Sequence, residues 1–342
     1  MSETQKPVSL GVGSAPYARL LGAFAALAAG ATAVVVGVVL VHGLPAITSS
    51  GSTSLGGSTA PAVTPALAPP TAAGFPVPPR GAVVLGAEAG RKVLGLAIVP
   101  GHGKIALQAS VVGIQGSGLK GLAVRFDVTG TSGQKATASA TPCGAGCYRA
   151  SVNIRRPRSV DVRLSGERPV SFAMPGAWPP PSAATIVQRA AAAWRNLVTL
   201  AYHDSLSDGH VTLQTNWKIV APDRIEYSIE KNLGAKIIIG DRSWNQLAGT
   251  TRWLPSPQYP VHQPVPFWQS VADAHLLGTV SYHGRPAWKV SFFDLAGGPA
   301  WFTILVDKGT LHTMELWMTA QDHFMHETYK AFNAPITITP PR

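Results

Sequence analysis

Alternating apolar and polar positions run through residues 93–172 and predict a series of short β-strands. Every second residue is apolar from Tyr148 to Ile154, and the same period of two returns in residues 160–164. Glycine-rich turns divide these runs at intervals of roughly eight to twelve residues, a spacing typical of a small sandwich. We therefore predict a β-sandwich over residues 80–174.

A helical period follows the proline-rich connector at residues 175–181. Apolar residues recur at steps of three and four from Ile186 to Val198, which predicts a helix of about eighteen residues that Ser182 can cap. Alternation then resumes in long runs without crossover helices, as in an antiparallel meander. The expected strands are 211–220, 224–230, 235–239, 275–282, 287–293, 301–306, 311–319 and 322–331, with a second short helix at 266–274. The predicted fold is mainly β, and residues 182–342 form an α+β domain in which a helix packs on a curved antiparallel sheet.

One apolar stretch is too long for a strand. Residues 20–42 contain no Asp, Glu, Lys or Arg, and the 22 residues from Leu20 to Val41 span about 33 Å as a helix, close to the thickness of a bilayer core. The short head at residues 1–19 contains Lys6 and Arg19, so we expect it to be cytoplasmic and the rest of the chain to lie outside. The stretch is predicted as a retained single-pass transmembrane helix, with a cleaved signal as the alternative. No cysteine follows it closely, which argues against a lipid-anchored lipoprotein.

Charge divides the remaining chain into two parts. Residues 43–79 are uncharged and rich in Pro, Ala, Ser, Thr and Gly, which predicts a disordered linker. Residues 80–182 hold thirteen Lys or Arg against four Asp or Glu, whereas residues 183–342 hold thirteen against twelve. A basic domain outside the cytoplasm suggests anionic lipid headgroups or a cell-wall polyanion as partner. Nucleic acid is not expected there, and a solvated basic face without a specific partner is the alternative.

The two cysteines are separated by three small residues. In an oxidising compartment, Cys143 and Cys147 are expected to form a disulfide that closes a glycine loop. A dithiolate site for a soft metal is the alternative.

The residues around these cysteines resemble a known family. The run 143–150, after the strand Gly-Leu-Ala-Val-Arg-Phe-Asp-Val, is similar to the YtkA/FixH-like immunoglobulin-type domain over about residues 92–172. Such domains often occur beside CopC/CopD copper-resistance membrane proteins. The resemblance implies an exported bacterial sandwich with a link to copper handling.

The second domain resembles the LolA/LppX-like half-barrel in its order of one helix followed by a strand meander. The matching segments are 221–224, 239–244, 306–309, 323–329, 332–333 and 336–341. In that family a curved sheet wraps an apolar cavity that holds acyl chains. Proteins that pair the two modules look actinobacterial.

Catalytic motifs are missing from the sequence. It shows no nucleophile motif, phosphate loop, zinc signature or paired-carboxylate site, so we do not expect an enzyme. His203, Asp204, Asp208 and His210 are close in sequence and could bind a metal, but a polar turn between helix and strand explains them better.

Methionine and histidine gather near the end of the chain. If a two-residue turn falls at Ala320–Gln321, Met318 lies opposite His323 and Leu316 opposite Met325. Thioether sulfur and neutral imidazole are ligands that Cu(I) prefers. The candidate copper ligands are His312, Met314, Met318, His323 and Met325. Ordinary core or apolar lining is the alternative explanation.

Tryptophans are dense in the second domain and could line a hydrophobic groove or fill a core. The candidates for lining an acyl cavity are Trp217, Trp244, Trp288 and Trp301. The sequence therefore predicts a membrane-anchored extracytoplasmic binding protein that holds a lipid or acyl chain in a half-barrel. A copper-binding protein that uses the His/Met face, and an envelope interaction module without a small ligand, are the alternatives.

Overall fold

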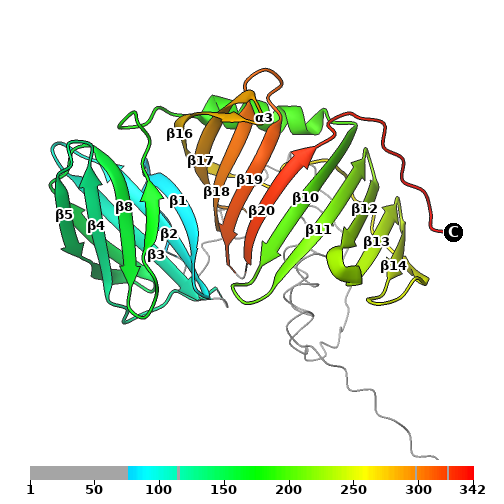
Figure 1. The fold of residues 1–342 in the computed structure, drawn as a ribbon, viewed down its shortest axis with the longest axis horizontal. Helices are drawn as coiled ribbons and strands as arrows, with labels where there is room; N and C mark the ends of the chain where they lie inside the picture. Colours follow the sequence, from blue (N-terminus) through cyan, green and yellow to red (C-terminus); the bar gives the residue numbers. More distant parts are fainter. Residues whose placement is uncertain (1–75, 114–115, 297–298, 322) are drawn as a thin grey trace, which may run out of the picture.

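The fold is that of a computed structural model that describes residues 76–342 apart from 114–115, 297–298 and 322 (Figure 1). The predicted cytoplasmic head, the transmembrane helix and nearly all of the linker lie outside these residues. Within the described part, no helix combines the length and apolar character needed to cross a membrane.

The first domain is a β-sandwich, as its alternation predicts. A five-stranded antiparallel sheet in the order β1-β2-β3-β7-β6 faces a four-stranded sheet in the order β5-β4-β8-β9. The strands are β1 Val83–Ala89, β2 Lys92–Pro100, β3 Ile105–Gly113, β4 Val124–Gly130, β5 Lys135–Ser139, β6 Thr141–Gly144, β7 Cys147–Val152, β8 Pro157–Leu164 and β9 Val170–Ala173. Leu94, Leu96 and Ile98 of the first sheet pack against Phe126 and Val162 of the second.

The predicted disulfide is confirmed. Cys143 and Cys147 are bonded with their Cα atoms 5.0 Å apart, at the turn that joins β6 to β7. Nearby, the Tyr148 hydroxyl donates a hydrogen bond to the Leu119 carbonyl at 2.7 Å and accepts one from the Leu122 amide at 3.1 Å. The side chain of Tyr148 thus fixes the loop that precedes β4 to the sandwich core.

The second domain is a single curved antiparallel sheet of eleven strands (Figure 1). Its order is β15-β14-β13-β12-β11-β10-β20-β19-β18-β17-β16, so the first and last strands of the domain lie side by side at its centre. The strands are β10 Thr199–Ser207, β11 Thr212–Val220, β12 Arg224–Ile229, β13 Gly234–Ile239, β14 Arg242–Gln246, β15 Trp253–Pro257, β16 Val271–Tyr282, β17 Arg285–Asp294, β18 Ala300–Asp307, β19 Thr313–Ala320 and β20 His323–Lys330. The described sheet does not close into a barrel, and the predicted meander is confirmed.

Helix α3, Ala184–Arg195, packs on one face of this sheet through Val187, Ala190 and Trp194. It is shorter than predicted, because the chain enters β10 at Thr199. Its N-cap position is Ala183, and Ser182 makes only a long contact of 3.4 Å with the Ala184 amide.

Two predictions about the second domain are wrong. The expected short helix at 266–274 does not form, because this segment is irregular as far as Ser270 and then enters β16. The expected polar turn around residues 203–204 is instead part of β10, a central strand. Tyr202, Asp204 and Leu206 are buried on one face of this strand and His203 lies on the other, so the polar Asp204 at a buried position hid a period of two.

The two domains dock through Trp301 of β18. Its indole lies over Gly86 of β1 and Gly95 of β2, on the outer face of the five-stranded sheet. A Cβ atom at Gly95 would lie 2.1 Å from Trp301 Cζ2, and one at Gly86 would lie 2.6 Å from Trp301 Cβ. Trp301 is 2% exposed and packs with Phe293, Val84 and Ala97 in a cluster that both domains share.

We expect Gly95→Val to lower the free energy of unfolding by about 2–3 kcal/mol, because the new side chain overlaps a ring that has no room to move. Urea unfolding followed by tryptophan fluorescence measures the change. Gly176→Val is the matched control, because a Cβ at exposed Gly176 meets no atom within 4 Å. Equal unfolding midpoints for the two variants would contradict the docking described here.

Candidate functional site

Aromatic rings fill the face of the curved sheet that α3 covers. Trp194 packs edge-on against Trp268 and Tyr329, with ring centroids 6.5 and 5.1 Å apart. Tyr202 stacks on Trp217 at 5.5 Å, and Trp217 in turn lies 4.6 Å from Tyr227. The face expected to line an acyl cavity is therefore an interlocked core around α3, and the two hollows described below lie elsewhere.

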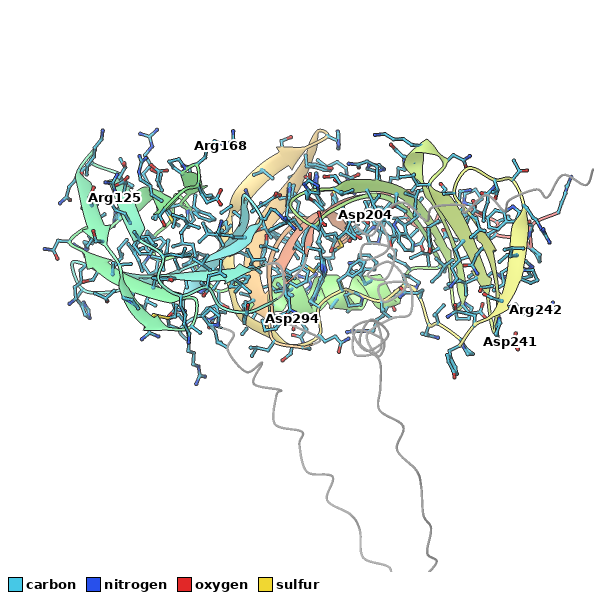
Figure 2. The ribbon with its side chains drawn as sticks, turned by 90° about the horizontal axis from the view of Figure 1, so that it is seen from below. Arg125, Arg168, Asp204, Asp241, Arg242 and Asp294 are labelled. Atoms are coloured by element: carbon cyan, nitrogen blue, oxygen red, sulfur yellow. A yellow bond between two sulfur atoms is a disulfide. The ribbon has the colours of Figure 1, made fainter. Side chains whose placement is uncertain are left out.

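A pair of acidic side chains is buried in this core. Asp204 of β10 and Glu327 of β20 are register partners, and each is 1% exposed. Figure 2 shows Asp204 near the middle of the molecule. Tyr329 donates a hydrogen bond to Glu327, and Trp217 donates one to Asp204. On the other side of Asp204, its register partner in β11 is the fully buried Thr215.

Burial sets the protonation of this pair. Loss of hydration raises the pKa of Asp204 to about 8, although the hydrogen bond from Trp217 opposes the shift. Burial, and after it the nearby Asp204, raise the pKa of Glu327 well above its ordinary value. Both carboxyl groups are therefore protonated in the folded protein at neutral pH. Sequence reasoning misses this pair because the polar residues 202–210 predict a turn where the structure has β10.

Asp204 has a raised pKa in the folded state, so the unfolded chain releases this proton first as the pH rises. The folded protein should therefore lose stability between about pH 4 and pH 8, at up to about 1.4 kcal/mol per pH unit. We expect Asp204→Asn to flatten this dependence, as measured by urea unfolding at pH 5 and pH 7.5.

Asp127→Asn is the control that should leave the pH dependence over this range unchanged. Hydrogen bonds from Arg163 and Thr137 lower the pKa of Asp127 against the effect of burial. This carboxylate is therefore ionised in both the folded and the unfolded chain at pH 5 and at pH 7.5, and its removal should leave the difference in stability between these pH values unchanged. An unchanged pH dependence in Asp204→Asn would contradict a buried, protonated Asp204.

The candidate copper ligands do not all share one face. Met318, His323 and Met325 point to the same side. The turn between β19 and β20 lies one residue later than predicted, so Met318 lies opposite Met325 and His323 lies opposite Ala320. A bulge between β18 and β19 places Met314 on the other face, against Leu305 and Ala287. His312 precedes β19, where its ring stacks on Phe332 at 4.4 Å.

Burial lowers the pKa of His323 to about 4, so this imidazole is neutral at physiological pH. Within residues 76–342 as described, no three His, Cys, Asp or Glu side chains form a group able to hold a metal ion. Copper binding stays a prediction.

The other candidate metal residues also separate. Asp204 points into the core, whereas the His203 ring contacts Gln214 and Asn216 on the opposite face at 2.8 and 3.3 Å. Asp208 accepts hydrogen bonds from the amides of His210 and Val211 at 2.8 and 2.7 Å. Of the turn predicted between a helix and a strand over residues 202–210, only residues 208–210 form a turn, and it joins strand β10 to strand β11.

The four tryptophans proposed to line a cavity occupy different places. Trp217 and Trp288 pack with the core on the α3 side, and Lys308 lies over the Trp288 ring at 5.6 Å. Trp244 lies opposite Ile237 and lines a shallow hollow of about 370 Å³ between β14 and β15. Trp301 does not line the hollows described here, because its ring is buried in the contact between the two domains.

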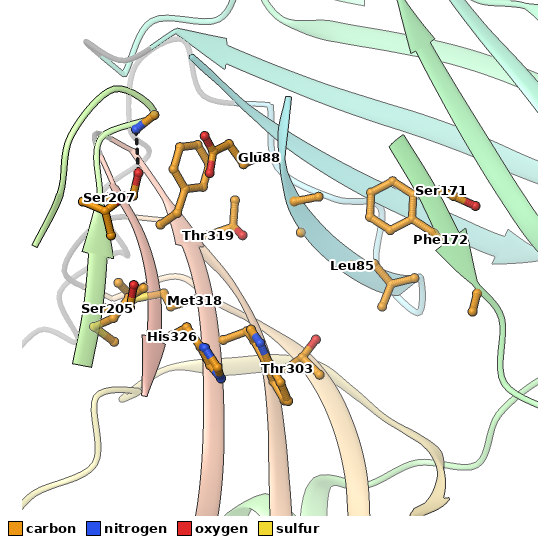
Figure 3. Close-up of a pocket in the computed structure, with 18 of the residues that line it drawn as sticks. Leu85, Glu88, Ser171, Phe172, Ser205, Ser207, Thr303, Met318, Thr319 and His326 are labelled. Carbon is orange, nitrogen blue, oxygen red and sulfur yellow. Dashed lines mark hydrogen bonds between the residues drawn. The ribbon is translucent and has the colours of Figure 1, made fainter. Parts of the chain in front are cut away.

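An open cleft of about 670 Å³ lies between the two domains, on the sheet face opposite α3 (Figure 3). The sandwich contributes Leu85 and Glu88 of β1 and Phe172 of β9, and Figure 3 shows them across the cleft from His326 and Thr303. Ser205, Ser207, Thr303, Thr319, Trp317, Phe324, His326 and Lys289 line the curved-sheet side. The sandwich wall thus combines small apolar residues with exposed Glu88 and Ser171, and the other wall is rich in hydroxyl groups.

A stack of side chains forms part of the hydroxyl-rich wall. The Trp317 and His326 rings are nearly parallel, with centroids 5.0 Å apart. The His326 Nε2 atom lies 2.7 Å from Glu315 Oε1, and the Lys289 ammonium lies 6.0 Å from the Trp317 ring centroid. These contacts hold an aromatic surface of fixed orientation beside the cleft.

Two serines of β10 line the cleft, and the hydroxyl group of each accepts one hydrogen bond within the protein. Ser205 Oγ accepts a hydrogen bond from the Gln214 side chain at 2.9 Å, and Ser207 Oγ accepts one from the Gly209 amide at 3.0 Å. Because a hydroxyl also carries one donor, each serine can still donate to an oxygen atom of a ligand.

Comparison with solved structures gives distant similarity. No protein-family model matches the sequence, and neither does any curated protein. The fold is similar to the crystal structure of the lipoprotein LppX from Mycobacterium tuberculosis, with a TM-score of 0.37 and 14% identity over 45% of this chain and 97% of that one. It is also similar to LprF from Mycobacterium bovis, with a TM-score of 0.35 and 11% identity over 47% of this chain and 99% of that one. Similarities of this size establish no shared ligand, and the resemblance of the sandwich to YtkA/FixH-like domains stays a prediction.

Proposed function

We propose that this chain is an extracytoplasmic binding protein, not an enzyme, that holds an amphiphilic lipid in the cleft between its domains. The uncharged run of residues 20–42 supports a location outside the cytoplasm, as a membrane-anchored protein. The interdomain cleft is the observation that carries the proposal. Its volume of about 670 Å³ falls within the range of roughly 300–1,000 Å³ typical of small-molecule sites.

The two walls of the cleft match the two parts of such a ligand. Ala87, Ala173 and the exposed edges of Leu85 and Phe172 form the apolar part of the sandwich wall, and an acyl chain placed against them gains free energy when it leaves water. Ser205, Ser207 and His326 offer hydrogen bonds to an oxygen-rich headgroup. The α3 side of the sheet is a poorer candidate, because its rings already contact one another.

Ala173→Trp should block the cleft. Ala173 is exposed and lines the cleft from β9, so a larger side chain at this position enters the open space. We expect this variant to bind a fluorescent long-chain phospholipid at least tenfold more weakly than the unaltered protein. Fluorescence titration of the full-length protein in mild detergent measures the affinity.

Ala106→Trp is the matched control, because Ala106 is an exposed strand residue of the same domain that does not line the cleft. Its affinity should stay within twofold of that of the unaltered protein. Binding that is lost equally in both variants, or kept in both, would exclude the cleft as the lipid site.

A further inference from the structure

Five exposed basic residues gather at one end of the sandwich, here termed the basic end. They are Lys104, Lys135, Arg155, Arg156 and Arg158. Lys104 directly precedes β3, whose first residue pairs with the last residue of β7. Arg155 and Arg156 lie in the connection that follows β7, and Arg158 and Lys135 stand at the beginnings of β8 and β5. Strand pairing therefore brings all five to the same end.

Hydrogen bonds hold the loops of this end together. The Gln134 side chain donates to the Asn153 carbonyl at 3.1 Å, and the Thr131 amide donates to the Arg156 carbonyl at 3.0 Å. The turn between β4 and β5 is thereby fixed to the connection between β7 and β8. The basic residues are presented by a framework of defined shape.

The four acidic residues of the sandwich lie away from the basic end. None of the five residues takes part in an ion pair among the described residues. Asp127 binds Arg125 and Arg163 in the middle of its sheet, and Glu167 binds Lys92 at the opposite end of the sandwich. Glu88 also lies toward that opposite end, as the second-to-last residue of β1. Asp161, the remaining acidic residue of the sandwich, lies opposite Asp127 in the middle of that sheet, so no ion pair among the described residues compensates the charge of the basic end.

We propose that the basic end docks on the anionic phospholipid headgroups of the membrane surface. Residues 43–75 separate the predicted membrane span from Pro76, and a chain of this length reaches at most about 110 Å. This length is an upper bound on the distance between Pro76 and the membrane, and within it the uncompensated charge favours the basic end as the face that meets the surface. Attraction between basic side chains and anionic lipids acts within a Debye length, about 10 Å at 0.1 M salt.

An energy-transfer measurement tests this orientation. The chain's two cysteines are joined, so Ser132→Cys in the turn between β4 and β5 supplies one free thiol for a fluorescent label. The full-length labelled protein is combined with vesicles that carry an acceptor dye on their headgroups. We expect transfer in vesicles with 30 mol% phosphatidylglycerol to be at least twice that in pure phosphatidylcholine, and to fall to the neutral level in 0.5 M salt.

The double variant Arg155→Glu with Arg156→Glu should reduce transfer in anionic vesicles to the neutral level. Arg189→Glu with Arg252→Glu is the matched control, because both arginines are exposed on the second domain and the change in net charge is the same. We expect this control to retain its transfer.

Equal transfer in both kinds of vesicle, or an equal loss in both double variants, would overturn the proposal. If a soluble phosphodiester polymer binds through Arg155 and Arg156 while anionic vesicles give no excess transfer, the partner is a cell-wall polyanion and the membrane proposal is wrong.

Discussion

The contact between Trp301 and two glycines sets the relation between the two domains. Gly86 and Gly95 lack a Cβ, so the indole lies directly on the strand backbones of β1 and β2. A buried tryptophan removes a large apolar area from water, and close packing fixes where it can sit. Because this contact occupies one part of the outer sheet face, the neighbouring part is left open as the cleft.

The two faces of the curved sheet therefore have different roles. The face under α3 is a filled aromatic core that also buries the Asp204–Glu327 pair. Two buried carboxyl groups are tolerated there because they are protonated and hydrogen-bonded, which avoids the large cost of a buried charge. The opposite face carries serine, threonine and histidine side chains that remain open to solvent and to the sandwich wall. A ligand thus has access to the outer face without unpacking the core.

Local patterns in the sequence predicted most of the strands, because a period of two is visible within a few residues. They failed where pairing over a long distance decides the structure. Strand β10 has its own alternation, but its partner β20 comes from the end of the chain, so the meeting of Asp204 and Glu327 had no local signal. A bulge at Met314 likewise reversed its face, which no alternation rule predicts.

The cleft was also hidden from sequence reasoning, because it exists only once two domains have docked. Trp288 and Trp301 look alike in the sequence, although one packs beside α3 and the other against the sandwich. One usable signal was present. Gly86 and Gly95 interrupt apolar strands, and a glycine inside a strand often marks the close approach of another group.

Photo-crosslinking of a bound lipid tests the central claim most directly. A phospholipid with a diazirine on its acyl chain is bound to the full-length protein, irradiated, and the modified peptides are identified by mass spectrometry. A ligand in the interdomain cleft predicts labels in β1 and β9, within residues 83–89 and 170–173. Labels confined to α3 and the segment 258–270 would place the lipid on the opposite face of the sheet and contradict the account.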